Sequence, residues 1–249
     1  MSTRTRLVLA AALFALTVLV RAPASWLLGA MPAAIECQLP AGSIWRGACR
    51  SLQLPGAVLY EVSWRLHPWS LLRARLELDL RSADERAPGT VTVALGPGGR
   101  LELRDLRAEL PIDAGFLPLF PRGWSGQLQL ALDEVEYRSG QLAQLRGTAT
   151  ARSLAQRHPA MPLGSYELNF PATPAAAGAN RRLLTGALRD LGGPLAVSGA
   201  LTIRGGREYE LAGLVAARPE AVAELAQAVE FLGPSDAQGR RSFSLSGTF

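Results

Sequence analysis

Three carboxylates in the stretch GQLQLALDEVEYR, namely Asp133, Glu134 and Glu136, are the residues of this chain most suited to acid–base chemistry. Two carboxyl groups with different pKa values can act as the proton donor and the base of a hydrolytic reaction. Here the acids alternate along an extended segment, which is typical of the solvated face of a strand. Nothing in the sequence singles out a catalytic pair among them, so we interpret them as surface charges.

Few other residues are candidates for catalysis or metal binding. His67 and His158 each precede a proline, a context that indicates turns and packing. Two histidines that lie far apart in the sequence and two cysteines do not make a metal site. The chain has no lysine, hence no phosphate-binding loop, and it has no Gly-x-Ser-x-Gly motif. We therefore predict no catalytic residue, no metal and no cofactor, and a protein that is not an enzyme.

The composition is that of a folded chain with many turns. Of the 249 residues, 48% are hydrophobic and 19% are charged, which excludes a disordered chain. The 17 prolines and 25 glycines favour short elements joined by turns. The net charge is +5, but the arginines are dispersed and do not form a basic stripe with interleaved aromatic residues. We predict no nucleic-acid partner.

The N-terminus carries a targeting signal. Arg4 and Arg6 precede an uninterrupted apolar run from Leu7 to Val20. These fourteen residues fall short of the roughly 20 that a membrane-spanning helix needs. One interpretation is the core of a cleaved signal peptide, with the small residues at 22–24 (Ala-Pro-Ala) as the cleavage site.

The other interpretation is an uncleaved anchor, which we favour because proline within the cleavage site opposes cleavage. The helix then continues past Arg21, which extends its guanidinium to the membrane interface, and places Trp26 in the interfacial aromatic belt. The predicted organisation is a cytoplasmic segment (1–6), a transmembrane signal-anchor helix (7–29) and a β-rich domain outside the cytoplasm (30–249).

The two cysteines frame a predicted hairpin. In ECQLPAGSIWRGAC, Gly42 and Gly47 flank Trp45, and Cys37 and Cys49 lie outside them. Glycine accepts the backbone conformations of tight turns, and the Trp45 ring can pack the turn onto a sheet. Because disulfides persist outside the cytoplasm, we predict that the hairpin places the cysteines opposite each other in a disulfide, which stabilises the fold by about 3 kcal/mol. Unpaired buried cysteines, or a partner contact at Trp45, are the alternatives.

The rest of the chain is dominated by alternation of apolar and polar residues. A period of two predicts strands with one apolar face, and the Gly/Pro turns between them predict antiparallel pairing. We therefore predict a mainly β fold with a curved, mostly antiparallel sheet and a few short helices. The alternating apolar positions are Leu76, Leu78, Leu80, Val91, Val93, Leu95, Leu101, Leu103, Leu128, Leu130, Leu132, Leu195, Val197, Leu201, Ile203, Tyr209, Leu211, Val215, Phe243 and Leu245.

Four segments depart from this alternation. Residues 67–74 can form one helical turn, and the proline-rich, apolar segment 111–124 can form a short helix or a lid. Residues 219–232 predict a helix, with Pro219 in its first turn and Gly233 after its end. Its apolar residues are spaced to dock on a sheet. Residues 171–182 read as a loop between two halves of the domain.

Several stretches, in this order and spacing, resemble the type II secretion system protein N family of Gram-negative bacteria. They are WLLGAMP, GSIWRG, VSWRLHPWSLLRARLELDL, LRDLRAELP, SGQLQLALDEV, LRDLGGPLAVSGALTI and LAQAVEFLGPSDAQGRRSFSLSGTF. The resemblance covers nearly the whole chain. It implies a single-pass inner-membrane protein with a periplasmic domain, which supports export of folded proteins across the outer membrane. It implies protein partners in the secretion system, in the inner-membrane platform or the outer-membrane secretin complex.

A different class of function is the alternative. A long antiparallel sheet with an apolar concave face can hold lipid acyl chains, as in the AsmA-like bridge proteins that this anchored β architecture loosely resembles. This hypothesis predicts a continuous apolar groove and lipid as a partner. The simplest interpretation of the four tryptophans is packing in the core, and this hypothesis offers a second one, contact with lipid or protein. They are Trp45, Trp64, Trp69 and Trp124.

Overall fold

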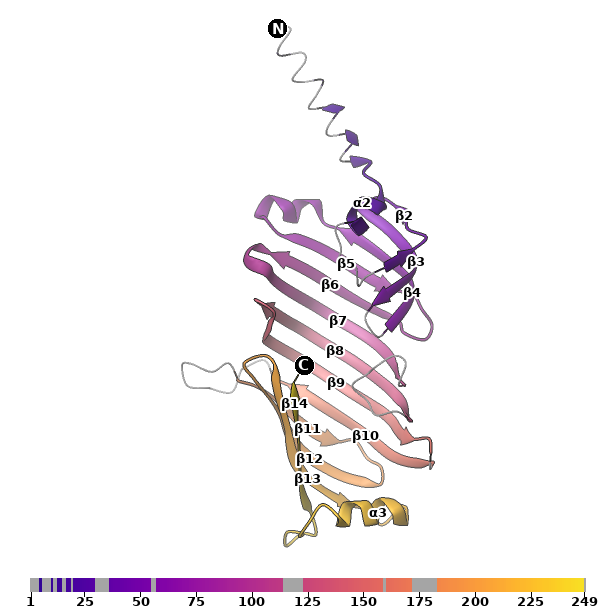
Figure 1. Ribbon diagram of the computed structural model, residues 1–249, viewed down its shortest axis with the longest axis vertical. Helices are drawn as coiled ribbons and strands as arrows, with labels where there is room; N and C mark the ends of the chain where they lie inside the picture. Colours follow the sequence, from indigo (N-terminus) through magenta and orange to yellow (C-terminus); the bar gives the residue numbers. More distant parts are fainter. Residues whose placement is uncertain are drawn as a thin grey trace.

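The computed structural model describes residues 5, 10, 13–14, 17–18, 20–29, 36–54, 57–113, 123–158, 160–171 and 183–248. Its main feature is one sheet of 14 antiparallel strands, in which each strand from β3 onward pairs with the next strand along the chain (Figure 1). The helices α2 and α3 lie at opposite ends of the sheet (Figure 1). The predicted mainly β, antiparallel fold class is confirmed, and the sheet is open.

The strands lengthen toward the middle of the sheet. In the first half they are β1 (Glu36–Gln38), β2 (Ala41–Gly42), β3 (Arg46–Leu54), β4 (Ala57–Leu66), β5 (Leu76–Ser82), β6 (Gly89–Gly96) and β7 (Arg100–Ile112). In the second half they are β8 (Trp124–Arg138), β9 (Gln141–Gln156), β10 (Met161–Phe170), β11 (Leu183–Asp190), β12 (Leu195–Arg204), β13 (Glu208–Ala217) and β14 (Arg241–Thr248). The helical elements are α2 (Ala24–Gly29), η1 (Pro68–Arg73), η2 (Pro97–Gly99) and α3 (Ala223–Glu230).

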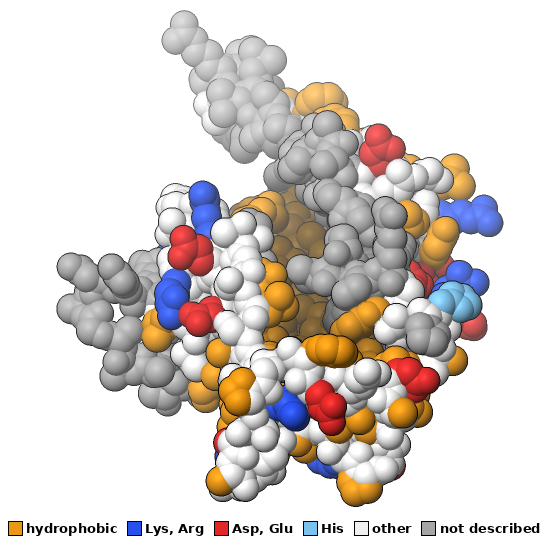
Figure 2. Space-filling model, turned by 60° about the horizontal axis from the view of Figure 1, so that its bottom comes forward, with side chains coloured by type: hydrophobic (Ala, Val, Ile, Leu, Met, Phe, Trp, Pro, Cys, Tyr) orange, Lys and Arg blue, Asp and Glu red, His pale blue; other side chains and the backbone are white. Residues whose placement is uncertain are grey.

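The strand register places the apolar residues of neighbouring strands on one face. Leu80 pairs with Val91, Leu78 pairs with Val93, and Val93 pairs with Leu103 on the next strand. Side chains of directly paired residues lie on the same side of a sheet, so these series form a continuous apolar face. Viewed from the α3 end, the molecule has a central hollow lined by hydrophobic side chains (Figure 2).

A pair of β-bulges keeps this face apolar across the middle of the sheet. The apolar phase of LELRDLRAEL changes between Leu103 and Leu106, and that of LQLALDEV changes between Leu132 and Val135. β7 and β8 change phase together, because Leu103 pairs with Val135 and Leu106 pairs with Leu132 without a register shift. The extra residues appear against the outer neighbours: β7 has one opposite Thr90–Thr92 of β6, and β8 has one between Leu132 and Glu134 opposite β9. An extra residue in a strand restores the face that a phase change would otherwise reverse.

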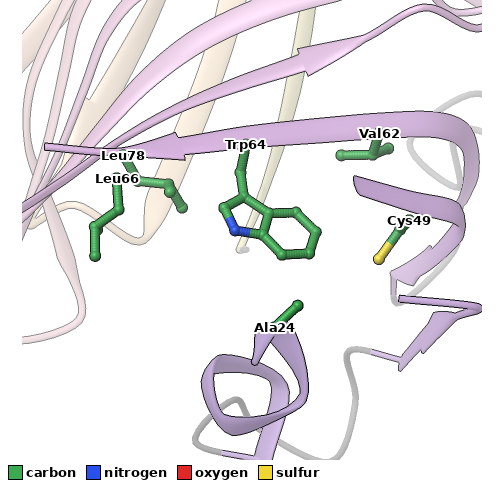
Figure 3. Close-up of a cluster of buried hydrophobic side chains, with 6 residues drawn as sticks. All are labelled: Ala24, Cys49, Val62, Trp64, Leu66 and Leu78. Carbon is green, nitrogen blue, oxygen red and sulfur yellow. The ribbon is translucent and has the colours of Figure 1, made fainter. Parts of the chain in front are cut away.

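The hydrophobic core is divided among three clusters along the sheet, and the second brings β8 and β9 against β12. The first contains Trp64 and Ala24 (Figure 3), the second contains Phe170 and Ile203, and the third contains Ile112 and Leu225. Since β10 and β11 pair directly, the sheet continues across the predicted loop at 171–182, of which residues 172–182 lie outside the described residues.

The predicted helix at 219–232 is shorter in the structure. It begins at Ala223 with Val222 as its N-cap residue, so Pro219 lies in the turn before it and not in its first turn. Leu225 and Val229 are buried, and Leu225 packs against Ile112 and Leu154 of the sheet. The apolar side of this helix therefore packs against the sheet of its own chain.

The predicted continuous helix at 7–29 is interrupted. Residues 21–23 are not helical, and Pro23 forms an isolated β-bridge with Ser43. Proline disfavours a helical conformation in the residue before it and offers no N–H to an α-helix. Leu7 and much of the apolar run lie outside the described residues, and in the part that is described no helix has the length and apolar character needed to cross a membrane.

Candidate functional site

The carboxylates of β8 are held by arginines on the polar face of the sheet. Asp133 lies 2.8 Å from Arg107, and Glu134 lies 3.0 Å from Arg146. Glu136 is only 3% exposed, and its Oε1 lies 2.6 Å from Nε of Arg100 and 2.5 Å from Nε of Arg138.

Glu102, the cross-strand neighbour of Glu136, is bound by Arg75 at 2.9 Å and by Arg100 at 2.7 Å. Two buried carboxylates side by side need such compensation, because burying unpaired charge is costly. The geometry is that of a structural ion network.

The two histidines lie apart. Nε2 of His67 lies 2.7 Å from the Asp79 carboxylate, which also accepts a 2.9 Å hydrogen bond from Thr92. Burial raises the pKa of Asp79, but the hydrogen bonds from His67 and Thr92 and the charges of His67 and Arg65 together lower it further, so the carboxyl ionises more readily than usual. His158 is exposed in a turn. Among the described residues, no group of three or more His, Cys, Asp or Glu side chains is arranged to hold a metal ion.

The predicted hairpin at Gly42–Gly47 is formed by β2 and β3. Gly42 has a φ of 89°, which a residue with a β-carbon adopts only with strain, and its N-terminal neighbour Ala41 pairs with Ala48. Ser43 donates a 2.8 Å hydrogen bond to the carbonyl oxygen of Arg46, which closes the turn around Trp45.

Cys37 and Cys49 form a disulfide, with their Cα atoms 5.7 Å apart. We had expected the two cysteines to lie directly opposite each other in the register. They do not, because Cys37 of β1 pairs with Leu52 of β3. Leu39, which has a positive φ, lies between β1 and β2, and both strands pair antiparallel with β3 in one continuous register. The disulfide therefore joins Cys37 to a residue three positions before its register partner Leu52.

The tryptophan at the centre of this region is Trp64, which the sequence offered only as one of four tryptophans for core packing or contact. Trp64 is 7% exposed and lies across from Gly47 on the neighbouring strand. Cys49 and Ala24 lie around its ring (Figure 3), and Trp45 packs at the margin of the same cluster. The signal that could have identified it is the glycine two residues before Cys49, which leaves room for a large ring on the next strand.

An apolar cavity of about 310 Å³ adjoins this cluster on the concave face of β3–β7. Its floor is aliphatic, and the few lining residues with polar side chains are Arg81, Ser82 and Thr90. The apolar residues that line it are Cys49, Leu52, Leu59, Val62, Trp64, Leu78, Leu80, Ala87, Val91, Leu106, Ala108 and Leu110. An apolar hollow of this size can hold part of a small hydrophobic ligand.

Exposed hydrophobic side chains gather at the end of the molecule that carries α2 and η1. In η1, Trp69 and Leu72 are each 79% exposed, and Trp26 of α2 is also exposed. The backbone of residues 44–45 joins the two elements, because Ile44 N–H donates to Ala22 and Trp45 accepts from the N–H of Leu66. α2 and η1 therefore lie at the same end of the sheet (Figure 1).

A family model described as "Type II secretion system (T2SS), protein N" matches residues 33–244. The chain is also 29% identical over 247 residues to "Type II secretion system protein N" of Aeromonas hydrophila, in an alignment that covers 94% of this chain and 95% of the relative. No solved structure matches the chain. The chain therefore belongs to the type II secretion system protein N family, and it is a component of that secretion system.

Proposed function

We propose that this protein is an accessory inner-membrane component of the type II secretion system. It supports export of folded periplasmic proteins across the outer membrane through protein–protein contacts, and it performs no catalysis. The observation that carries this proposal is the family match over residues 33–244, which spans the whole described sheet up to β14.

Three features support the proposed location, with a cytoplasmic N-terminus, one membrane anchor and a periplasmic sheet. Arg4 and Arg6 before the apolar run favour a cytoplasmic start. Exposed tryptophan and leucine side chains at the α2 and η1 end suit the interface of a membrane, where an amphipathic ring contacts both lipid and water. The Cys37–Cys49 disulfide is in keeping with an oxidising compartment.

The edge strand β14 is the surface that best suits contact with another secretion component. Among the described strands it pairs only with β13, so one row of its backbone groups is open to a partner strand. The helix α3 is less suited to such a contact, because Leu225 and Val229 are already buried.

The secretion role is tested by deleting the gene and comparing exoproteins in the medium with those retained in the periplasm. We expect exoproteins to accumulate in the periplasm and the intact gene to restore export. Unchanged export in the deletion strain would refute the proposal. Co-purification of the full-length protein with inner-membrane secretion components tests the contacts, and protease accessibility of a C-terminal tag in spheroplasts tests the orientation.

A further inference from the structure

We propose that the apolar cavity on the concave face of β3–β7 binds an acyl chain of a membrane phospholipid. The lining is formed by aliphatic side chains from successive strands, with Leu52 and Leu59 at one side and Leu106 and Leu110 at the other. Covering such a surface is favourable by about 25 cal/mol for each Å² removed from water.

The chemistry of the lining favours an acyl chain over a polypeptide. The backbone groups of β3–β7 already pair with one another in the sheet. Of the polar side chains at the cavity, the Ser82 hydroxyl bonds the Tyr60 carbonyl. A peptide in the cavity would bury N–H and C=O groups without partners, at a cost of several kcal/mol for each group. An acyl chain has no such groups.

The apolar floor continues beyond the cavity along the sheet. Leu110 pairs with Leu128, and Leu128 pairs with Ala151. The residues of β9 on this face are small, namely Gly147, Ala149 and Ala151, so their side chains project little from the sheet. The same face then runs through Leu168, Leu188, Leu201, Leu211 and Leu245. A chain longer than the cavity therefore finds apolar surface along its further length.

The position of the cavity favours a lipid that comes from the membrane, and this step rests on the proposed inner-membrane location. Cys49, Val62, Trp64 and Leu78 line the cavity and also pack around Ala24 at the start of α2. The cavity is thus continuous with the segment that connects the sheet to the apolar N-terminal run. A phospholipid can insert its acyl chain into the groove and keep its headgroup at the membrane surface.

The test uses full-length protein, purified in detergent and mixed with a phospholipid that carries a photoreactive diazirine near the end of one acyl chain. After illumination, labelled positions are mapped by mass spectrometry of peptides. We expect labels on the concave residues of β5, β6 and β7, and displacement of the label by excess unlabelled phospholipid. Labels confined to residues before 30, or no label that unlabelled lipid displaces, would overturn the proposal.

A matched pair of substitutions sharpens the test. Ala108 lines the cavity, and Ala131 is exposed and pairs with Arg107 on the opposite face of the neighbouring strand. We expect Ala108→Trp to fill the cavity and lower labelling by about tenfold, which corresponds to about 1.4 kcal/mol of binding free energy, while Ala131→Trp leaves labelling unchanged. Equal labelling of both variants would contradict the proposal. If Ala108→Trp does not fold, the positions labelled in the unsubstituted protein test the proposal by themselves, as described above.

Labelling and export are separate measurements, so the two proposals can fail separately. If no label on the groove residues is displaced by unlabelled lipid, lipid binding is refuted and the proposed secretion role is unaffected. Unchanged export in the deletion strain refutes the secretion role, and the label map still decides whether the groove takes an acyl chain.

Discussion

Glycine and an aromatic ring meet across neighbouring strands at several places in the sheet. A β-carbon added to Gly47 would lie 2.3 Å from the ring of Trp64, and one added to Gly247 would lie 2.6 Å from the hydroxyl of Tyr209. Gly186 is covered in the same way by Phe170. An aromatic side chain over a cross-strand glycine covers backbone that would otherwise be exposed. These glycines therefore serve packing, and alanine at such a site would displace the ring.

We predict that Gly47→Ala lowers the free energy of unfolding by about 1–3 kcal/mol, the usual cost of overpacking a core. Trp64 would have to move away from Ala24 and Cys49 to make room for the methyl group. Denaturant unfolding followed by tryptophan fluorescence measures the change.

The control is Gly96→Ala, because the nearest atom to an added β-carbon there is 3.7 Å away and the backbone is extended. We expect that substitution to change stability by no more than about 0.5 kcal/mol. Equal losses in both variants would mean that the Trp64 contact is not the cause.

Among the elements, the junction of β10, β11, β12 and β13 contains one partly buried ion pair. The Asp190 carboxylate lies 2.5 Å from Nη2 of Arg218 and accepts from the backbone N–H groups of Gly192 and Val197. Arg218 also donates to the carbonyl oxygens of Gly193 and Leu195. The pair ties the turn between β11 and β12 to the segment that leads into α3.

Tyr166 of β10 lies beside this pair. Its hydroxyl donates to the carbonyl of Leu163, and burial, together with the nearby charge of Asp190, raises its pKa to about 12. The phenol therefore stays neutral at every physiological pH. It contributes a hydrogen bond to the junction and no charge.

We predict that Asp190→Asn lowers stability at pH 7 by about 1–3 kcal/mol, because a partly buried Arg218 would lose its counter-ion. Burial raises the pKa of Asp190, but Arg218 and the two N–H groups lower it further, so its pKa in the folded chain is below the usual value of about 4. A group with a lowered pKa stabilises the fold above its unfolded pKa, and that contribution is lost as the pH falls through the lowered value.

Thermal unfolding at a series of pH values checks this prediction. The native chain should lose stability more steeply than the variant from about pH 5 downward. If the two curves run parallel through the acid range, the ionisation of Asp190 does not support the junction.

The molecule as a whole is a single layer of strands in which each strand contacts mainly its neighbours. As in repeat proteins, the stability of such an arrangement comes mainly from contacts between neighbouring strands and less from one central core. The central strands β7, β8 and β9 have 13, 15 and 16 residues, while β14 has 8 and is mostly exposed.

We predict that amide hydrogen exchange is graded along the sheet. Hydrogen-bonded amides of β8 should exchange on the order of tenfold more slowly than those that β14 makes with β13, because opening the edge exposes far less surface than opening the centre. Exchange mass spectrometry of the full-length protein measures this gradient. Uniform exchange from β3 to β14 would show that the sheet opens as one cooperative unit.

Much of the sheet could be predicted from alternation in the chain. Leu76, Leu78 and Leu80 lie on β5 as expected, and the Gly96-Pro97-Gly98-Gly99 turn joins β6 to β7. Because side chains of a strand alternate strictly between faces, local sequence is enough to predict a strand and its apolar side. The disulfide followed from a count of two cysteines and an expected compartment.

Other features depended on contacts between segments that are distant in sequence. The choice of Trp64 over Trp45 as the buried ring rests on the pairing of β3 with β4, and the burial of Glu102 and Glu136 rests on arginines from other positions. The helix at 219–232 was predicted four residues too early at its start, because the turn after β13 places Pro219 before the helix and local pattern does not report that turn.

The class of fold and the family could be recognised from the sequence alone. The features that indicate them, namely alternation, turns and the apolar N-terminal run, depend only on residues that are neighbours along the chain. Folding alone decided that the apolar faces of successive strands join into one concave surface and leave an open cavity beside Trp64 and Ala24. The reason is that register and bulges, such as the one in β7 at Asp105 opposite β6, depend on the pairing of two strands, and a shift of one residue would turn the apolar series to the other face.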